Sequence, residues 1–193
     1  MIAVALDADE NAVREWATKE PMTMPILIDK FHIVADLYGI VNVPAAIWID
    51  EDDKIVRPAD SIPGSDLFRS FTNVDSQIHH DLLRKWVRNG ERDLNDAQVR
   101  EFQVRPTNEV QMARLHRRVA IALRERNQTG DDVASRKHLT KAEELAPLDW
   151  TIRRGNMPLG GVDPFGEEFF KFVGEWTQAG RPGFKLGTGR VTD

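Results

Sequence analysis

The residues that could do acid–base, nucleophilic or metal chemistry in this chain are its histidines, carboxylates and serines, because it contains no cysteine. That absence excludes thiolate nucleophiles, disulfides and cysteine-ligated zinc or iron–sulfur sites. His79, His80 and Asp81 come nearest to a metal-binding cluster. Adjacent residues on a helix point about 100° apart, so their side chains do not converge on one ion. We therefore expect both histidines to be solvated.

The other reactive side chains have structural explanations. No serine lies in a nucleophile-elbow motif, and the paired carboxylates follow strands or begin helices, where they form turns and complement helix dipoles. His32, His116 and His138 have no partner that the sequence identifies. The sequence therefore predicts no catalytic residue, no metal site and no cofactor.

Composition narrows the class of protein. The chain has 193 residues, of which 26 are basic and 31 acidic, giving a net charge of -5 that disfavours a nucleic-acid partner. No apolar stretch reaches the ~20 residues of a membrane span, and the opening lacks a leader pattern. A globular cytoplasmic protein without membrane contact is expected.

The first part of the chain alternates strands and helices. Strands are expected at "IAVALD", "TMPILID", "VPAAIWID" and "KIVRP", with helices over 7–20 and 30–39. The acidic turn "EDDK" should join the last two strands in an antiparallel hairpin. The predicted order over the first 57 residues is βαβαββ, which indicates an α/β fold.

Helices follow. Two shorter ones are expected over 79–90 and 94–104, and two longer ones over 107–127 and 131–146 should form an antiparallel hairpin. The apolar periodicity of each long helix predicts which of its faces points toward the core. The first face is Met112, Leu115, Val119 and Ala122, and the second is Ser135, Leu139, Ala142 and Ala146. The arginines between 114 and 126 are expected to form a solvated, ion-paired surface.

The last part is rich in glycine, proline and aromatics. Only residues 166–176 have helical periodicity, and "DWTIRRGNMPLGG" is expected to be an ordered connector, or a segment wedged between elements or between subunits. Because so many aromatics must cover a surface, we expect this segment to pack on the body or on a second subunit. The predicted contact residues are Trp150, Arg153, Arg154, Phe169 and Trp176.

Residues 2–57 resemble the second half of a thioredoxin-like domain of the redoxin branch, which contains peroxiredoxins and thiol–disulfide reductases. The resemblance rests on "VALD", "MPILID", "HIVADLYGIVNVPAAIWID" and "DDKIV", in that order. It implies that Val43–Pro44 is the family's cis-proline bond, beside the active site, where the backbone pairs with an extended substrate. Val43 and Pro44 are binding residues on this resemblance. The long helical hairpin, more weakly, is similar to a single tetratricopeptide unit.

The resemblance implies a gap. Family members begin with a further strand, followed by a strand and helix that carry the redox cysteines, and this chain is expected to start after both. The missing cysteine-bearing strand would leave two inner strand edges unpaired, which is costly. Direct pairing of residues 2–7 with 45–50, insertion of the tail, or a strand from a second copy could fill the gap. We favour a homodimer, which could be strand-swapped.

These observations predict three parts and three functions. The parts are a truncated thioredoxin-like domain over 1–75, a helical region over 76–150 and a C-terminal segment over 151–193. The first function is a redox-inactive thioredoxin-like module that binds a protein or peptide. The second is the distal part of a redoxin-type oxidoreductase or peroxiredoxin-like antioxidant protein. The third is a cysteine-independent enzyme using histidine and carboxylates.

Overall fold

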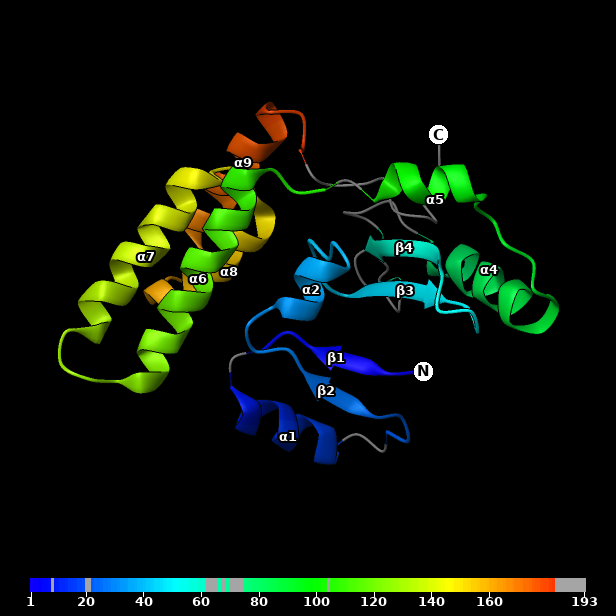
Figure 1. Ribbon diagram of the computed structural model, residues 1–193, viewed down its shortest axis with the longest axis horizontal. Coiled ribbons are helices and arrows are strands. Elements are labelled where there is room, and N and C mark those ends of the chain that lie inside the picture. The colour runs from blue at the N-terminus through cyan, green and yellow to red at the C-terminus, as the bar shows by residue number, and fades with distance from the viewer. Residues whose placement is uncertain are drawn as a thin grey trace. The chain divides into compact units, whose positions relative to one another are not determined.

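The protein has a mixed α/β fold: in the part of the chain that the structure describes, four short strands form two small sheets and an all-helical region follows. The computed structural model describes residues 1–7, 9–19, 22–61, 66, 69, 75–103 and 105–182 (Figure 1). It divides into two compact units, one made of residues 1–37 and 106–182 and the other of residues 38–105. Over residues 3–61 the element order is βαβαββ, as the sequence predicts. The three-part domain division stays a prediction.

The first unit opens with a parallel strand pair. Strands β1 (Ala3–Ala5) and β2 (Ile26–Ile28) pair with Ala3 opposite Ile26, and helix α1 (Glu10–Lys19) connects them. Helix α2 (Ile33–Leu37) follows after Asp29, whose carboxylate accepts hydrogen bonds from the backbone N–H groups of Ile33 at 2.7 Å and Ala35 at 2.9 Å. Asp29 thus satisfies two of the donors that a helix start leaves unpaired.

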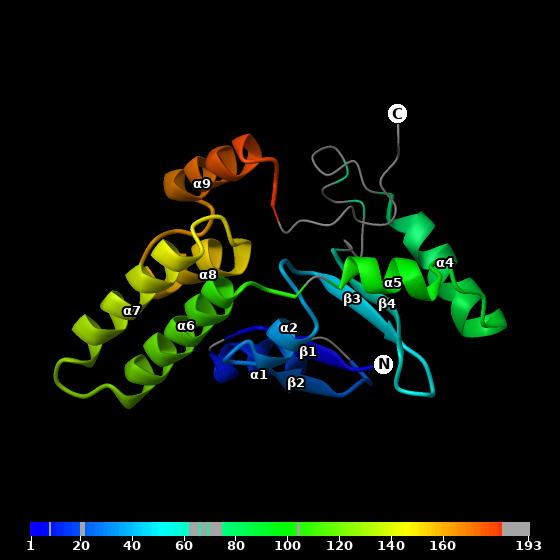
Figure 2. The same ribbon diagram turned by 45° about the horizontal axis from the view of Figure 1, so that its top comes forward.

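Four helices complete the first unit, namely α6 (Asn108–Arg126), α7 (Asp131–Leu145), α8 (Trp150–Gly160) and α9 (Glu167–Gln178). Helix α6 packs along α7 as the predicted hairpin, and α8 packs on both (Figure 2). Their shared core contains Ala113, Ala142, Ala146 and Ile152. Because three of these are alanines, the helices can approach closely.

The predicted inward face of α7 is correct, but that of α6 is wrong. Met112, Leu115 and Val119 are 47%, 48% and 42% exposed, and Ala122 is also exposed. The buried face of α6 instead carries Ala113, Arg117, Ala120 and Ile121. On α7, Ser135 is fully buried and donates its hydroxyl to the carbonyl of Ala120 at 3.0 Å.

Three arginines of α6 are not on a solvated surface. Arg117 is buried, and its guanidinium lies against Gly155 of α8, where an added Cβ would come within 3.3 Å of Nε. Arg118 donates from Nε to the carbonyl of Phe31 at 3.1 Å and forms an ion pair with Asp36. Arg114 reaches the same carboxylate at 3.2 Å. These contacts attach α2 to α6.

The second unit contains the hairpin of β3 (Ala45–Ile49) and β4 (Ile55–Ser61), followed by α4 (Ser76–Asn89) and α5 (Asp96–Phe102). The two strands are antiparallel, as predicted, with Ala46 opposite Asp60. Within the described residues, β1 and β2 form one two-stranded sheet and β3 and β4 form another. The peptide bond between Val43 and Pro44 is cis.

Candidate interaction surface on α8 and α9

Residues 150–160, expected to lack regular structure, form helix α8. The carboxylate of Asp149 accepts a hydrogen bond from the N–H of Ile152 at 3.1 Å and so begins the helix. As a result, Trp150, Arg153 and Arg154 stand at i, i+3 and i+4 and share one face. Helix α9 presents Phe169, Phe172 and Trp176 at i, i+3 and i+7, also on one face, as its periodicity predicts.

Aromatic rings join the two helices. The Trp150 ring lies 5.9 Å from that of Phe169, 5.3 Å from that of Phe172 and 4.9 Å from that of Trp176, centroid to centroid. Phe172 is fully buried and Trp176 is 6% exposed. Edge-to-face ring pairs at these separations stabilise packing beyond the area that they bury. The cluster therefore fixes α9 on α8.

Two exposed rings extend this cluster to the surface. Phe165 and Phe170 are 66% and 64% exposed, although their rings lie 6.0 and 5.3 Å from that of Phe169. The adjacent residues Phe169 and Phe170 point about 100° apart on a helix, so they cannot both face inward. This spacing was the sequence signal for an exposed ring, and the predicted site omitted both Phe165 and Phe170.

The two arginines of α8 have different environments. Arg153 lies 5.1 Å over the Phe172 ring, donates to the carbonyl of Pro147 at 3.2 Å and has Glu175 at 3.7 Å. Arg154 lies 4.8 Å over Phe165 and has no carboxylate partner among the described residues. Burial lowers the pKa of its guanidinium. Arg154 is therefore a half-buried cation beside an exposed aromatic ring.

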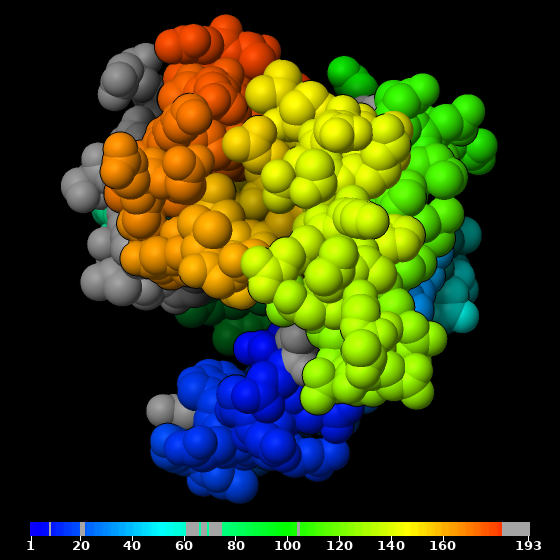
Figure 3. All heavy atoms as spheres, turned by 90° about the vertical axis from the view of Figure 1, so that its left-hand side faces the viewer, coloured from blue at the N-terminus to red at the C-terminus, as the bar shows by residue number. Residues whose placement is uncertain are grey.

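The structure brings together all five predicted contact residues, which lie on one pair of helices in the first unit. We call this set, with Phe165 and Phe170, the α8–α9 surface. Figure 3 shows α7 and the segment from α8 to α9 on one face of the molecule. Val43 and Pro44 belong to the second unit, where both are exposed. Their binding role stays a prediction.

His79 is buried, so the expectation that it is solvated is wrong. It is 4% exposed and its ring lies 5.5 Å from that of Trp48, which stacks on Trp86 at 5.2 Å. Arg57 lies 5.0 Å over the Trp48 ring. Burial and the charge of Arg57 lower the pKa of His79 to about 4. The imidazole is therefore neutral near pH 7.

Two other histidines meet across the long hairpin. Nδ1 of His116 lies 2.7 Å from Nδ1 of His138, so one ring donates a hydrogen bond to the other. Burial and the neighbouring His138 lower the pKa of His116. Within the part of the chain that the structure describes, no group of three or more histidine and carboxylate side chains could hold a metal ion.

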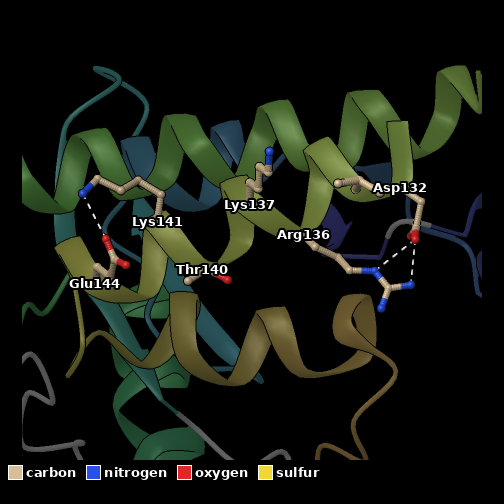
Figure 4. Close-up of a pocket in the computed structure, with 7 residues that line it drawn as sticks. Asp132, Arg136, Lys137, Thr140, Lys141 and Glu144 are labelled. Atoms are coloured by element: carbon tan, nitrogen blue, oxygen red, sulfur yellow. Dashed lines mark hydrogen bonds and ion pairs between the residues drawn. The ribbon is translucent and has the colours of Figure 1, made fainter. Parts of the chain in front are cut away.

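An open hollow runs along α7, and charged side chains line it (Figure 4). Arg136 pairs with Asp132 at 2.6 Å, and Lys141 with Glu144 at 3.0 Å. These exposed pairs already neutralise one another, and exposed pairs of this kind contribute little to binding or stability. The hollow is therefore a weaker candidate than the α8–α9 surface.

Comparison with known proteins supports a distant relation to thiol–disulfide oxidoreductases. The chain is 34% identical over 56 residues to the thiol–disulfide oxidoreductase ResA of Bacillus thuringiensis subsp. konkukian, and 36% identical over 56 residues to that of Bacillus anthracis. Each match covers 28% of this chain and 32% of the relative, so the similarity spans about a third of those proteins' length. No protein-family model and no solved structure matches.

The similarity to ResA does not bring thiol chemistry to this chain. This chain has no cysteine, so it cannot carry out thiol–disulfide exchange, because that reaction requires a thiolate. None of the described helices is long and apolar enough to cross a bilayer.

Proposed function

We propose that this protein is a redox-inactive relative of the redoxins that acts by binding, and that its contact site is the α8–α9 surface. The observation that carries the proposal is the environment of Arg154, a partly desolvated cation stacked on the exposed ring of Phe165 without a carboxylate partner among the described residues. Exposed aromatics and arginine are the residue types that contribute most to protein interfaces.

The chemistry of this surface favours one kind of partner. Phe165 and Phe170 offer apolar contact area, while Arg154 offers planar donors that fit a carboxylate. Both exposed rings contact the Phe169 ring, which packs against Trp150, so their positions are partly fixed before binding. The proposed partner is a protein segment that presents an apolar side chain beside an aspartate or glutamate.

Selection from a library of displayed short random peptides against the full chain tests this. Enriched peptides should combine an aromatic or aliphatic residue with a neighbouring acid. Measured by calorimetry, Arg154→Gln should lower the affinity for an enriched peptide roughly tenfold, which is a loss of about 1.4 kcal/mol of binding free energy. It should leave the affinity for the same peptide with amides in place of its acids nearly unchanged.

Phe165→Ser should lower the affinity for both the acidic peptide and its amide version, because the substitution removes apolar contact area. Val133→Ser is the matched control, since Val133 is an exposed apolar residue of α7 outside the α8–α9 surface. Equal affinities of the wild-type protein, Arg154→Gln and Phe165→Ser would refute the proposed site. Insulin reduction and peroxide consumption should both be absent, and turnover in either assay would contradict a redox-inactive role.

A second candidate is the distal part of a redoxin-type oxidoreductase. The partial similarity to ResA favours it. The test is the genomic sequence upstream of the coding region. An upstream segment in the same reading frame that encodes a strand and helix carrying cysteine would support this function. The lack of any such segment in that reading frame would remove it.

A further inference from the structure

Two histidines join the long helices of the first unit. His116 lies on α6 and His138 on α7, and their Nδ1 atoms are 2.7 Å apart. The two ring centroids are 4.9 Å apart, and the ring planes are inclined to one another by 39°. Both residues are half-buried, so the pair is held between the helices and is still reached by solvent. An imidazole nitrogen from each helix therefore meets the other at one point of the hairpin.

The separation of the two rings fits a shared metal ion. Divalent transition metals bind an imidazole nitrogen through a bond of about 2.1 Å. At that bond length, two imidazoles on one ion have centroids roughly 4.5 to 5.2 Å apart, as the angle at the ion goes from about 90° to about 109°. The observed separation of 4.9 Å lies within this interval. The rings can therefore ligate one ion by turning in place, without a change in the distance between α6 and α7.

Small residues beside the pair leave room for that rotation. On α6, Ala120 lies one turn after His116. On α7, Ala134 and Ala142 lie one turn before and one turn after His138. Alanine has no side-chain atom beyond Cβ, so none of these neighbours blocks a turn of either ring.

The electrostatic surroundings of the pair are compatible with a bound cation near neutral pH. Burial and the neighbouring His138 lower the pKa of His116, which favours the neutral imidazole that metals bind. Lys141 has a smaller effect in the same direction. Its ammonium group is paired with Glu144 at 3.0 Å, as Figure 4 shows, so its charge is partly compensated. No cysteine thiolate competes for the ion, because the chain has none.

We propose that His116 and His138 together bind one divalent transition-metal ion of the Zn²⁺ or Ni²⁺ type, with water completing its coordination. The ion takes the place of the hydrogen bond between the two Nδ1 atoms. When both imidazoles are neutral, each then carries its proton on Nε2, so the ring that donated the hydrogen bond changes tautomer and no net proton is released. Because the ion needs both helices in place, it stabilises the folded α6–α7 hairpin.

Titration calorimetry of the full chain, without an affinity tag, tests this with Zn²⁺ near neutral pH. One ion should bind per chain. His116→Gln and His138→Gln should each lower the affinity at least about tenfold, because either substitution leaves a single protein ligand. His80→Gln is the matched control, since it removes an imidazole from the second unit and should bind Zn²⁺ as the wild type does.

Two further measurements distinguish ligation by this pair from adsorption elsewhere on the chain. In NMR spectra of the imidazole nitrogens, Zn²⁺ should shift the Nδ1 resonances of His116 and His138 and leave those of His79 unchanged. In urea, Zn²⁺ at about a hundred times its dissociation constant should lower the unfolding equilibrium constant of the wild type about a hundredfold. His116→Gln and His138→Gln should show much smaller changes at the same Zn²⁺ concentration.

Three results would overturn the site. They are no Zn²⁺ binding by the wild type, equal Zn²⁺ affinities of the wild type and the two histidine variants, and bound Zn²⁺ that leaves both Nδ1 resonances unshifted. Circular dichroism confirms that each variant is folded. None of these measurements involves α8 or α9, so their outcome leaves the proposed α8–α9 surface to its own test.

Discussion

Acidification should destabilise the second unit through His79. Its imidazole is 4% exposed and packs beside Trp48, and the charged or titratable groups around it are Arg57, Asp60, Asp93 and His80. The folded-state pKa is lowered to about 4, whereas an unfolded chain has a histidine pKa near 6.5. Between those values the unfolded state binds a proton that the folded state excludes. The free energy of unfolding therefore decreases as the pH falls.

The size of the effect follows from the two pKa values. Proton linkage gives a loss of about 2 kcal/mol on going from about pH 7 to about pH 5, and roughly 3 kcal/mol once the pH is below both values. Urea unfolding followed by tryptophan fluorescence measures this difference. His79→Leu removes the titrating group, so its loss between the two pH values should be about 2 kcal/mol smaller than that of the wild type.

His80→Leu is the matched control, because it removes a neighbouring imidazole but leaves burial and Arg57, the two largest causes of the lowered His79 pKa, so most of the pH dependence should remain. Comparing each protein with itself at two pH values cancels any change in packing that the substitution introduces. His32, whose pKa burial also lowers to about 4, contributes equally in all three proteins. An identical pH dependence in His79→Leu and the wild type would refute the argument that burial keeps His79 neutral.

Two further predictions concern the foundation of the α8–α9 surface. Phe172→Ala removes a fully buried ring and should lower the free energy of unfolding by about 3–5 kcal/mol in urea titrations. Phe170→Ala, at an exposed site, should lower it by less than about 1 kcal/mol. Equal losses would contradict the assignment of Phe172 to the core. Asp149→Ala removes the cap of α8 and should cost about 1 kcal/mol. Faster hydrogen exchange at Ile152 is expected, and unchanged exchange there would show that the cap does not hold the first turn.

The sequence predicted the order of the strands and helices to residue 61, because periods of two and 3.6 residues and the intervening turns are local signals. Helix α8 was missed because Gly155 and Pro158 have low helix propensity and no apolar period runs through it. Packing on α6 and α7 stabilises it nevertheless. Its local signals were Asp149 at the N-cap and Gly161 at the C-cap position.

The inward face of α6 could not be chosen from the sequence because the helix has two candidate faces. One carries Met112, Leu115 and Val119, and the other carries small alanines and Arg117. The second is buried because Gly155 leaves space for the guanidinium of Arg117, and nothing in α6 itself indicates that. Similarly, the burial of His79 depends on Trp48 and Trp86, which are far from one another in the chain.

The attachment of α2 by Arg118 limits where this chain can be divided into fragments that keep their structure. The carbonyls of Phe31 and His32 and the carboxylate of Asp36 all accept hydrogen bonds from one guanidinium that lies more than eighty residues later. A fragment that ended before α6 would expose those acceptors to water and free α2 to rearrange. The strand pair and the long helices therefore depend on one another for their structure.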